Sequence, residues 1–498
     1  MNRIFQRYEN YLPAGILFLS AILIAFFVAL NTTETLTGLI CLLTVPVLGY
    51  VLFFNRKLCI PILVFLIPLS VNSEIGGGAQ TDFPAEPLLG IFVLVMLVYW
   101  LLHPKISRSV LKHPLTILIF LELMWMIVCS ANGELPLVSF KRCIVRFSYI
   151  VVFYILFSQW FENLKNGLRL FLIYASGCLI PVLHTLYYHA LCDFSAISAY
   201  LMPRPFFPEH TIYGACLAFL LPMLLMIVFH AKEFAIRGVN YFGLLLLAIL
   251  ISTGEFLSYS RAAWISLGVA LLFRIFIFFR IRFWIILLLL FFGGMIVYKN
   301  YNPILELIKR TESTSNKGDI SEHILSVTNL QSDVSNLERI NRWKCAIRMA
   351  EKKPLTGFGP GTYQFVYGSF QSQADMTRIS TFRGTNGHAH SEIFNSLSEE
   401  GIPGMLIYVV LMFSVIGYGL KIIYRPLEKK ERLIAIGALL GLVTYYVHGF
   451  FNAFLDTEKM AALVFGSIAI LVHLNVEQKK RMRLLQIEKK NLLPTDEK

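Results

Sequence analysis

Charged side chains are scarce in this chain. Asp, Glu, Lys and Arg make up 15% of its 498 residues, whereas 56% of the residues are apolar and the mean hydropathy is +0.64. A soluble globular domain carries about 25% charged and about 45–50% apolar residues. The shortage of charge therefore excludes an ordinary water-soluble enzyme and indicates a membrane protein.

Acidic residues are fewer than basic ones, 31 against 44, so the formal net charge is +13. Such an excess can mark a nucleic-acid partner, but the Lys and Arg residues of membrane proteins concentrate in cytoplasmic loops. With a cytoplasmic N-terminus, the cytoplasmic segments hold 26 basic residues and the short outside loops hold six. Residues 299–400 hold the other twelve beside eleven acids. We therefore expect no nucleic-acid partner and place both termini in the cytoplasm.

Paired cysteines are also absent. The eight cysteines are scattered, mostly within apolar runs, and no C-x-x-C pair occurs. This pattern argues against a disulfide framework or a zinc site and predicts small buried side chains. The apolar run after Met1–Asn10 has no small-residue cleavage site, so we expect a retained first span rather than a signal peptide.

Long apolar runs are abundant. About fourteen are long enough, or nearly so, to cross a bilayer. They begin near Leu12, Thr35, Leu58, Pro84, Pro114, Cys143, Leu168, Thr211, Tyr241, Ala262, Arg282, Gly404, Leu433 and Met460. The run at Leu58 is the shortest and contains two prolines, so it could be a tilted or re-entrant segment. We predict an all-α polytopic membrane protein with about 12–14 transmembrane helices.

One long polar segment interrupts these runs and divides the chain. We expect an N-terminal transmembrane bundle of about eleven spans over residues 1–298 and a large, mostly helical outside loop over residues 299–400. About three further spans follow over residues 401–475, and residues 476–498 form a basic cytoplasmic tail. A long loop held between two spans is usually functional.

Local patterns predict the structure of this loop. Residues 311–329 are polar and expected to be mobile, and Ser335-Asn-Leu-Glu338 matches a capping box that opens a helix ending at Pro354. Gly357-Phe-Gly-Pro-Gly361 predicts a turn. Gly401-Ile-Pro-Gly404 predicts a second turn that closes the loop before the next span.

Arginines and a histidine are the candidate reactive residues. Arg261 stands at the outer end of a span, and Arg339 and Arg342 share one face of the predicted loop helix. Alone, Arg261 is better explained by snorkelling or helix capping, and the pair on the loop helix is better explained by a solvated helix face. Together with His390 they suit a phosphorylated lipid, because guanidinium groups bind phosphate bidentately and histidine is a general base near neutral pH.

A metal site is the alternative for the histidines. His388 and His390 are followed by Glu392, and such residues can bind a metal ion. Residues at i and i+2 do not share a helical face, however, and no further His or Cys cluster lies nearby in the sequence. We therefore predict neither a metal nor a cofactor.

The order of these motifs resembles the O-antigen ligase/polymerase superfamily. The motifs are Ser260-Arg-Ala-Ala-Trp264, then Arg339-x-x-x-Trp343 leading to Pro354-Leu-Thr-Gly-Phe-Gly-Pro-Gly361, and finally His390-Ser before Gly401-Ile-Pro-Gly404. The motifs cover roughly residues 254–408. Each motif is loose, but their order around one large outside loop is fairly specific.

The resemblance implies a GT-C-like membrane fold in the bacterial inner membrane, with a periplasmic active site. It implies a glycan donor linked to undecaprenyl pyrophosphate and a metal-independent, inverting transfer. By analogy, Arg261 and Arg339 hold the pyrophosphate and His390 activates the acceptor hydroxyl. Further candidates for substrate binding are Arg342, the rival of Arg339, together with His388, Arg378 and Arg383.

Three acceptors remain open within this resemblance. A ligase moves the glycan to lipid A-core, a polymerase moves it to another lipid-linked repeat, and an oligosaccharyltransferase moves it to Ser or Thr of a protein. The ligase is the first choice. A transporter or flippase for the same lipid is the alternative from another class, but it predicts repeated halves and ionisable residues within spans. Few such residues occur here, chiefly Glu122, Glu255 and Arg274.

Overall fold

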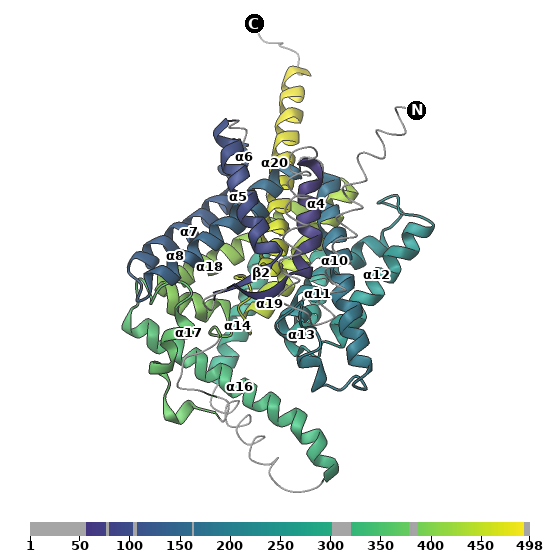
Figure 1. Cartoon of the computed structure of the whole chain (residues 1–498). Helices are drawn as coiled ribbons and strands as arrows, with labels where there is room; N and C mark the ends of the chain where they lie inside the picture. Colours follow the sequence, from purple (N-terminus) through teal and green to yellow (C-terminus); the bar gives the residue numbers. More distant parts are fainter. Residues whose placement is uncertain are drawn as a thin grey trace. The chain divides into compact units, whose positions relative to one another are not determined.

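The computed structural model describes residues 56–75, 79–102, 107–161, 164–300, 320–377, 380 and 387–492. Over these residues the chain is mainly helical, with two short strands (Figure 1), which confirms the predicted all-α class. Nine of the described helices are long and apolar enough to cross a membrane, and three shorter apolar helices accompany them. These helices correspond to the predicted runs from Leu58 onward, while the runs at Leu12 and Thr35 lie outside the described residues.

The chain divides into two compact units. The first holds the described residues before Ser107 together with Val151–Trp264 and Thr457–Ile470. Its elements are α4 (Arg56–Leu66), β1 (Val71–Ile75), β2 (Ala79–Phe83), α5 (Ala85–Leu102), α9 (Phe157–Trp160), α10 (Leu164–Ala190), α11 (His210–Phe229) and α12 (Val239–Phe256). The strands pair antiparallel with Val71 opposite Phe83, a hairpin that the sequence patterns did not predict.

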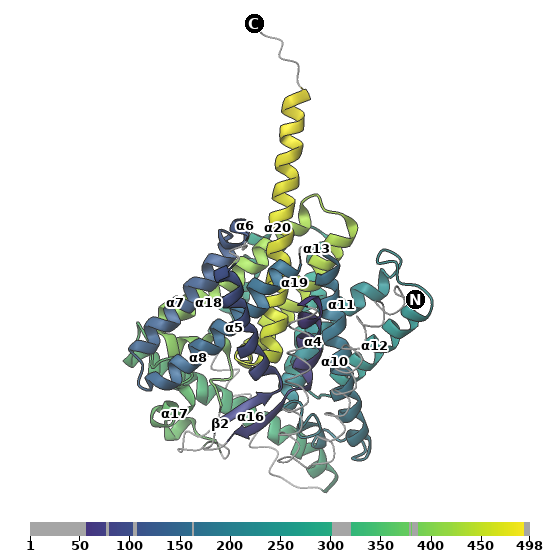
Figure 2. The same ribbon diagram turned by 45° about the horizontal axis from the view of Figure 1, so that its top comes forward.

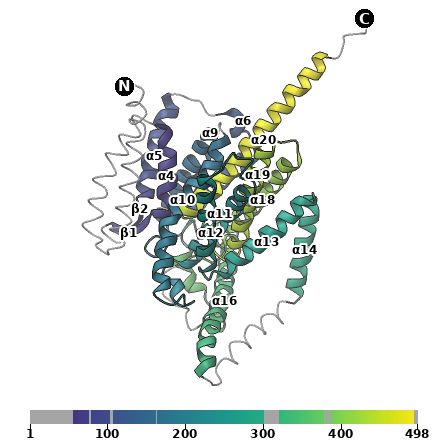
Figure 3. The same cartoon turned by 90° about the vertical axis from the view of Figure 1, so that its right-hand side faces the viewer.

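The second unit holds Ser107–Ile150, Ile265–Asp456 and the residues from Leu471 onward. Its elements are α6 (Arg108–Leu111), α7 (Pro114–Ala131), α8 (Pro136–Tyr149), α14 (Phe283–Lys299), α16 (Ile320–Lys352), α17 (Tyr363–Val366), α18 (Glu392–Tyr424) and α19 (Lys429–Gly449). Two helices contribute to both units: α13 (Arg261–Phe278), which a tight turn joins to α14 (Figure 3), and α20 (Glu458–Leu492), a single long helix (Figure 2). The predicted division at residues 298, 400 and 475 stays a prediction.

Helix composition decides which helices are central. In α11, apolar residues surround the whole helix, and 89% of its membrane-length window is buried. In α12 only 33% of the corresponding window is buried. A helix that is apolar all round packs inside a bundle, so α11 is central to the first unit and α12 exposes an apolar face suited to lipid.

The loop helix differs from the prediction at its start. The prediction that a capping box at Ser335 opens the helix is wrong, because α16 begins at Ile320 and runs through this position. No proline or glycine interrupts residues 320–334, so nothing stops the helix there. Part of the predicted mobile stretch, residues 320–329, is therefore helical, and residues 311–319 lie outside the described residues. The end at Pro354 is confirmed, since α16 stops at Lys352.

The second glycine motif is a kink within a helix rather than a turn that closes the loop. Helix α18 already begins at Glu392, and Gly401 has a φ of 73° inside it. Pro403 has no N–H, which leaves the Glu399 carbonyl free of its usual helical partner. That carbonyl accepts the Gly359 N–H at 2.8 Å, and Ile402 donates to the Pro354 carbonyl at 2.8 Å. The kink therefore joins α18 to the turn that follows α16.

The loop also has an apolar core of its own. On α16, Cys345, Ala346 and Met349 are buried against the turn that follows the helix. The other buried members of this cluster are Phe358, Tyr363, Tyr367 and Ala389. Because Ala389 stands between the two candidate histidines, this core places the histidine segment against α16.

Candidate active site

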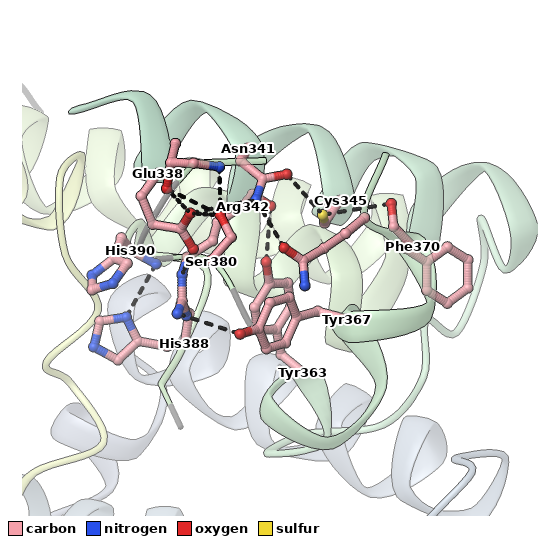
Figure 4. A network of polar contacts seen from close by, with 12 residues as sticks. Glu338, Asn341, Arg342, Cys345, Tyr363, Tyr367, Phe370, Ser380, His388 and His390 are labelled. Carbon is pink, nitrogen blue, oxygen red and sulfur yellow. Dashed lines mark hydrogen bonds and ion pairs between the residues drawn. The ribbon is translucent and has the colours of Figure 1, made fainter. Parts of the chain in front are cut away.

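His390 lies just before α18 in a sharply bent segment. Its φ of 51° is in the left-handed region, which residues other than glycine rarely adopt. Its N–H donates to Nδ1 of His388 at 3.1 Å, and the two rings lie edge to face with their centroids 4.8 Å apart. The bend therefore brings both imidazoles to one place (Figure 4).

Helix α16 holds this segment through two side chains. Nε1 of Trp343 donates to the His390 carbonyl at 3.4 Å, and Nη1 of Arg342 donates to the His388 carbonyl at 3.0 Å. The Trp343 ring stacks on Phe394 of α18 with a centroid distance of 5.2 Å. The backbone on which His390 depends is thus fixed by residues far away in the sequence.

The surroundings keep both imidazoles neutral. Burial lowers the pKa of His390 well below its usual 6.5, and His388, Arg342 and Arg339 lower it further, against a hydrogen bond with Asn452. Burial, followed by the charge of Arg342, lowers the pKa of His388 to about 4. Nδ1 of His390 is buried and meets no hydrogen-bond partner within the described part of the chain. At neutral pH, His390 is therefore a neutral imidazole suited to accept a proton.

Arg339 stands on the same helix, about one turn before Arg342. Its Nη1 donates to Oδ1 of Asn336 at 3.1 Å, and its charge acts on His390. An arginine near a neutral histidine supplies a cation for an anionic group without competing for the proton. This combination suits a reaction in which a phosphate group leaves.

Arg261 occupies the first position of α13 in the first unit, and its side chain is exposed. The preceding Ser258 and Ser260 are buried against α11. A Cβ at Gly214 of α11 would lie 2.7 Å from Oγ of Ser258, so glycine permits this approach. The prediction of an arginine at a helix end is thus confirmed.

The predicted site residues fall into three groups. Arg339, Arg342, His388 and His390 come together in the second unit. Arg261 lies in the first unit, where it is described by itself. The two remaining candidates, Arg378 and Arg383, lie outside the described residues, and their roles stay predictions.

A cluster of charged residues that acts on His388 was not predicted from the sequence. On α8, Arg142 and Arg146 place their Nη2 atoms 3.1 and 3.2 Å from the carboxylate of Asp456. Burial by itself raises the pKa of Asp456, but these two guanidinium groups hold it below its usual value. Asp456 and Arg142 also act on His388. The i, i+4 spacing of the two arginines was the signal, since it places both on one helix face.

Part of the chain that contains these residues matches a known protein family. Residues 244–409 match the family model described as O-antigen ligase. Over these residues the chain is similar to that family, which supports the predicted resemblance to the O-antigen ligase/polymerase superfamily. The matched range contains Arg261, Arg339 and His390 and extends to the kink of α18. It supports ligase- or polymerase-type activity of a multi-pass membrane enzyme on lipid-linked glycans in general. No curated protein matches the chain.

Proposed function

We propose that this protein is an O-antigen ligase-like glycosyltransferase. It transfers a glycan from undecaprenyl pyrophosphate to lipid A-core at the periplasmic face of the bacterial inner membrane, with both termini in the cytoplasm. The observation that carries the proposal is His390, a neutral imidazole with Nδ1 unpartnered within the described residues, beside the cation of Arg339.

The proposed reaction is a single displacement. His390 takes the proton from an acceptor hydroxyl, and the hydroxyl oxygen attacks the anomeric carbon of the donor. The bond from that carbon to the pyrophosphate oxygen breaks, and undecaprenyl pyrophosphate leaves with the electron pair. Arg339 pairs with the phosphate charge, and the family resemblance assigns the same role to Arg261, so no divalent cation is needed. One displacement inverts the anomeric carbon.

The central experiment uses the full chain in nanodiscs with an undecaprenyl-pyrophosphate-linked glycan and lipid A-core. We expect His390→Ala to lower kcat by about 10²–10⁴-fold, the usual contribution of a general base. His230→Ala is the matched control, because the His230 ring contacts the carbonyl of Met226 on its own helix. Wild-type turnover by well-folded His390→Ala would refute the role of His390. Loss of turnover with EDTA and its recovery with Mg²⁺ would refute metal independence.

The acceptor needs a separate experiment. Lipid A-core, a second lipid-linked repeat and a protein rich in Ser and Thr are offered in parallel to the wild-type enzyme. A product on lipid A-core alone supports the ligase. Chain extension on the lipid-linked repeat identifies a polymerase, and a glycosylated protein identifies an oligosaccharyltransferase.

A further inference from the structure

The guanidinium group of Arg342 is engaged by groups of the protein itself. Nε donates to Oε1 of Glu338 at 3.1 Å, Nη1 to the His388 carbonyl at 3.0 Å and Nη2 to the Tyr367 hydroxyl at 3.4 Å (Figure 4). The guanidinium carbon also lies 4.9 Å from the centre of the Tyr367 ring. Three hydrogen bonds and an aromatic face give this side chain one orientation.

The partners of Arg342 are themselves fixed. Glu338 is buried and also accepts hydrogen bonds from the hydroxyls of Thr377 and Ser380. The Tyr367 ring stacks on Tyr363 with a centroid distance of 5.0 Å and an interplanar angle of 2°. Both tyrosines belong to the apolar core of the loop. The guanidinium is thus tied to the buried core of the loop rather than to exposed side chains.

One chain of contacts leads from this anchor to His390. Arg342 holds the carbonyl of His388, and Nδ1 of His388 accepts the N–H of His390. The left-handed φ of His390 is unfavourable for a residue with a side chain and needs such support. Removal of Arg342 would release the backbone that orients the His390 ring.

We propose that Arg342 is a positioning residue, which holds the His388–His390 segment for proton abstraction and does not bind the donor pyrophosphate. This inference rests on the proposed function of His390. It replaces the sequence-based expectation that Arg342 contacts substrate, and it leaves phosphate binding on this helix to Arg339.

The positive charge of Arg342 also affects the pH dependence of kcat, which a purely structural residue would leave unchanged. The groups that act on His390 are His388, Arg342, Arg339 and Asn452, and Asp456 acts through His388. Because the charge of Arg342 lowers the pKa of His390, its removal raises that pKa. The acidic limb of the kcat profile then moves to higher pH.

The experiment compares Arg342→Gln and Arg342→Lys in full-length protein in nanodiscs with the undecaprenyl-pyrophosphate-linked donor. We expect Arg342→Gln to lower kcat by about 10²-fold through misplacement of the base, with the KM for donor nearly unchanged and the acidic limb at higher pH. We expect Arg342→Lys to lower kcat but to leave the acidic limb of the pH profile in place. Lysine keeps the positive charge but lacks the planar guanidinium group that makes several hydrogen bonds at once. Arg348→Gln is the control, because that arginine binds the Phe370 carbonyl and Asp375.

If Arg342→Gln fails to fold, Tyr367→Phe removes only the hydroxyl partner, and we expect a fall in kcat of about two- to tenfold at constant KM. A large rise in donor KM at constant kcat, or no change in either constant, overturns the inference. His390→Ala separates the two proposals. If that variant is active, the proposed function fails with the inference; if it is inactive while Arg342→Gln changes only KM, the inference alone fails.

Discussion

At the scale of the residue, the environment of a side chain decides what the side chain does. His388 and His390 are alike in sequence, but in the structure Nδ1 of His388 accepts a backbone N–H and Nδ1 of His390 meets no partner among the described residues. Arg339 and Arg342 share a helix, yet Arg342 is held by a carboxylate, a carbonyl and a hydroxyl. The sequence suggested four candidate residues by type, and packing gave each of them different contacts.

The pH profile tests this difference directly. The pKa of His390 is well below 6.5, so the neutral form that accepts a proton persists as the pH falls from 7 to 6. We therefore expect kcat of the wild-type enzyme to stay level across this interval and to decline only at lower pH. A half-maximal kcat at pH 6.5 or above in single-turnover measurements would contradict the predicted neutral base.

At the scale of the element, a proline and a glycine decide how α18 meets the loop. Pro403 leaves the carbonyl of Glu399 unpaired within the helix, and the positive φ of Gly401 bends the chain there. The Glu399 carboxylate accepts the N–H groups of Gly361 and Tyr363 at 2.8 and 2.9 Å. The two glycine motifs, at residues 357–361 and 401–404, were predicted as separate turns, but in the structure the segments that carry them are hydrogen-bonded to each other and form one joint.

Gly401→Ala should weaken this joint. A Cβ at Gly401 would meet the Leu355 carbonyl, and a positive φ costs a non-glycine residue about 1–3 kcal/mol. We expect the free energy of unfolding to fall by at least that amount, measured by thermal or denaturant unfolding in detergent. Gly268→Ala on α13 is the matched control, since nothing lies within 4 Å of its Cβ position. Equal stabilities of the two variants would show that the kink tolerates a side chain.

At the scale of the whole molecule, the apolar helices and the placement of basic residues predict an orientation in the membrane. Among the described residues, nine long apolar helices and three shorter ones agree with the twelve apolar runs predicted from Leu58 onward. The excess of basic residues in alternate loops predicts that the loop helix α16 and His390 lie outside the cytoplasm. The low charged fraction that excluded a soluble enzyme also suits a substrate that is itself a membrane lipid.

Cysteine labelling tests this orientation. In a Cys192→Ser background, which removes an exposed thiol, Ala374→Cys reports on the loop and Lys429→Cys on the opposite side. We expect a membrane-impermeant maleimide added to intact spheroplasts to label Ala374→Cys. Lys429→Cys should react only after the membrane is permeabilised. The reverse pattern would invert the topology and place His390 in the cytoplasm.

The sequence by itself determined the membrane class, the helices from Leu58 onward, the end of α16 near Pro354 and the resemblance to the O-antigen ligase family, because these depend on composition, periodicity and motif order along the chain. It failed at Ser335 and Gly401, where a local pattern matched a cap and a turn but neighbouring residues continued the helix. Only the tertiary structure decided that Arg342 holds His388, that His390 is neutral and that Arg142, Arg146 and Asp456 lie together. Those properties depend on burial and on distances between residues far apart in sequence, which packing alone creates.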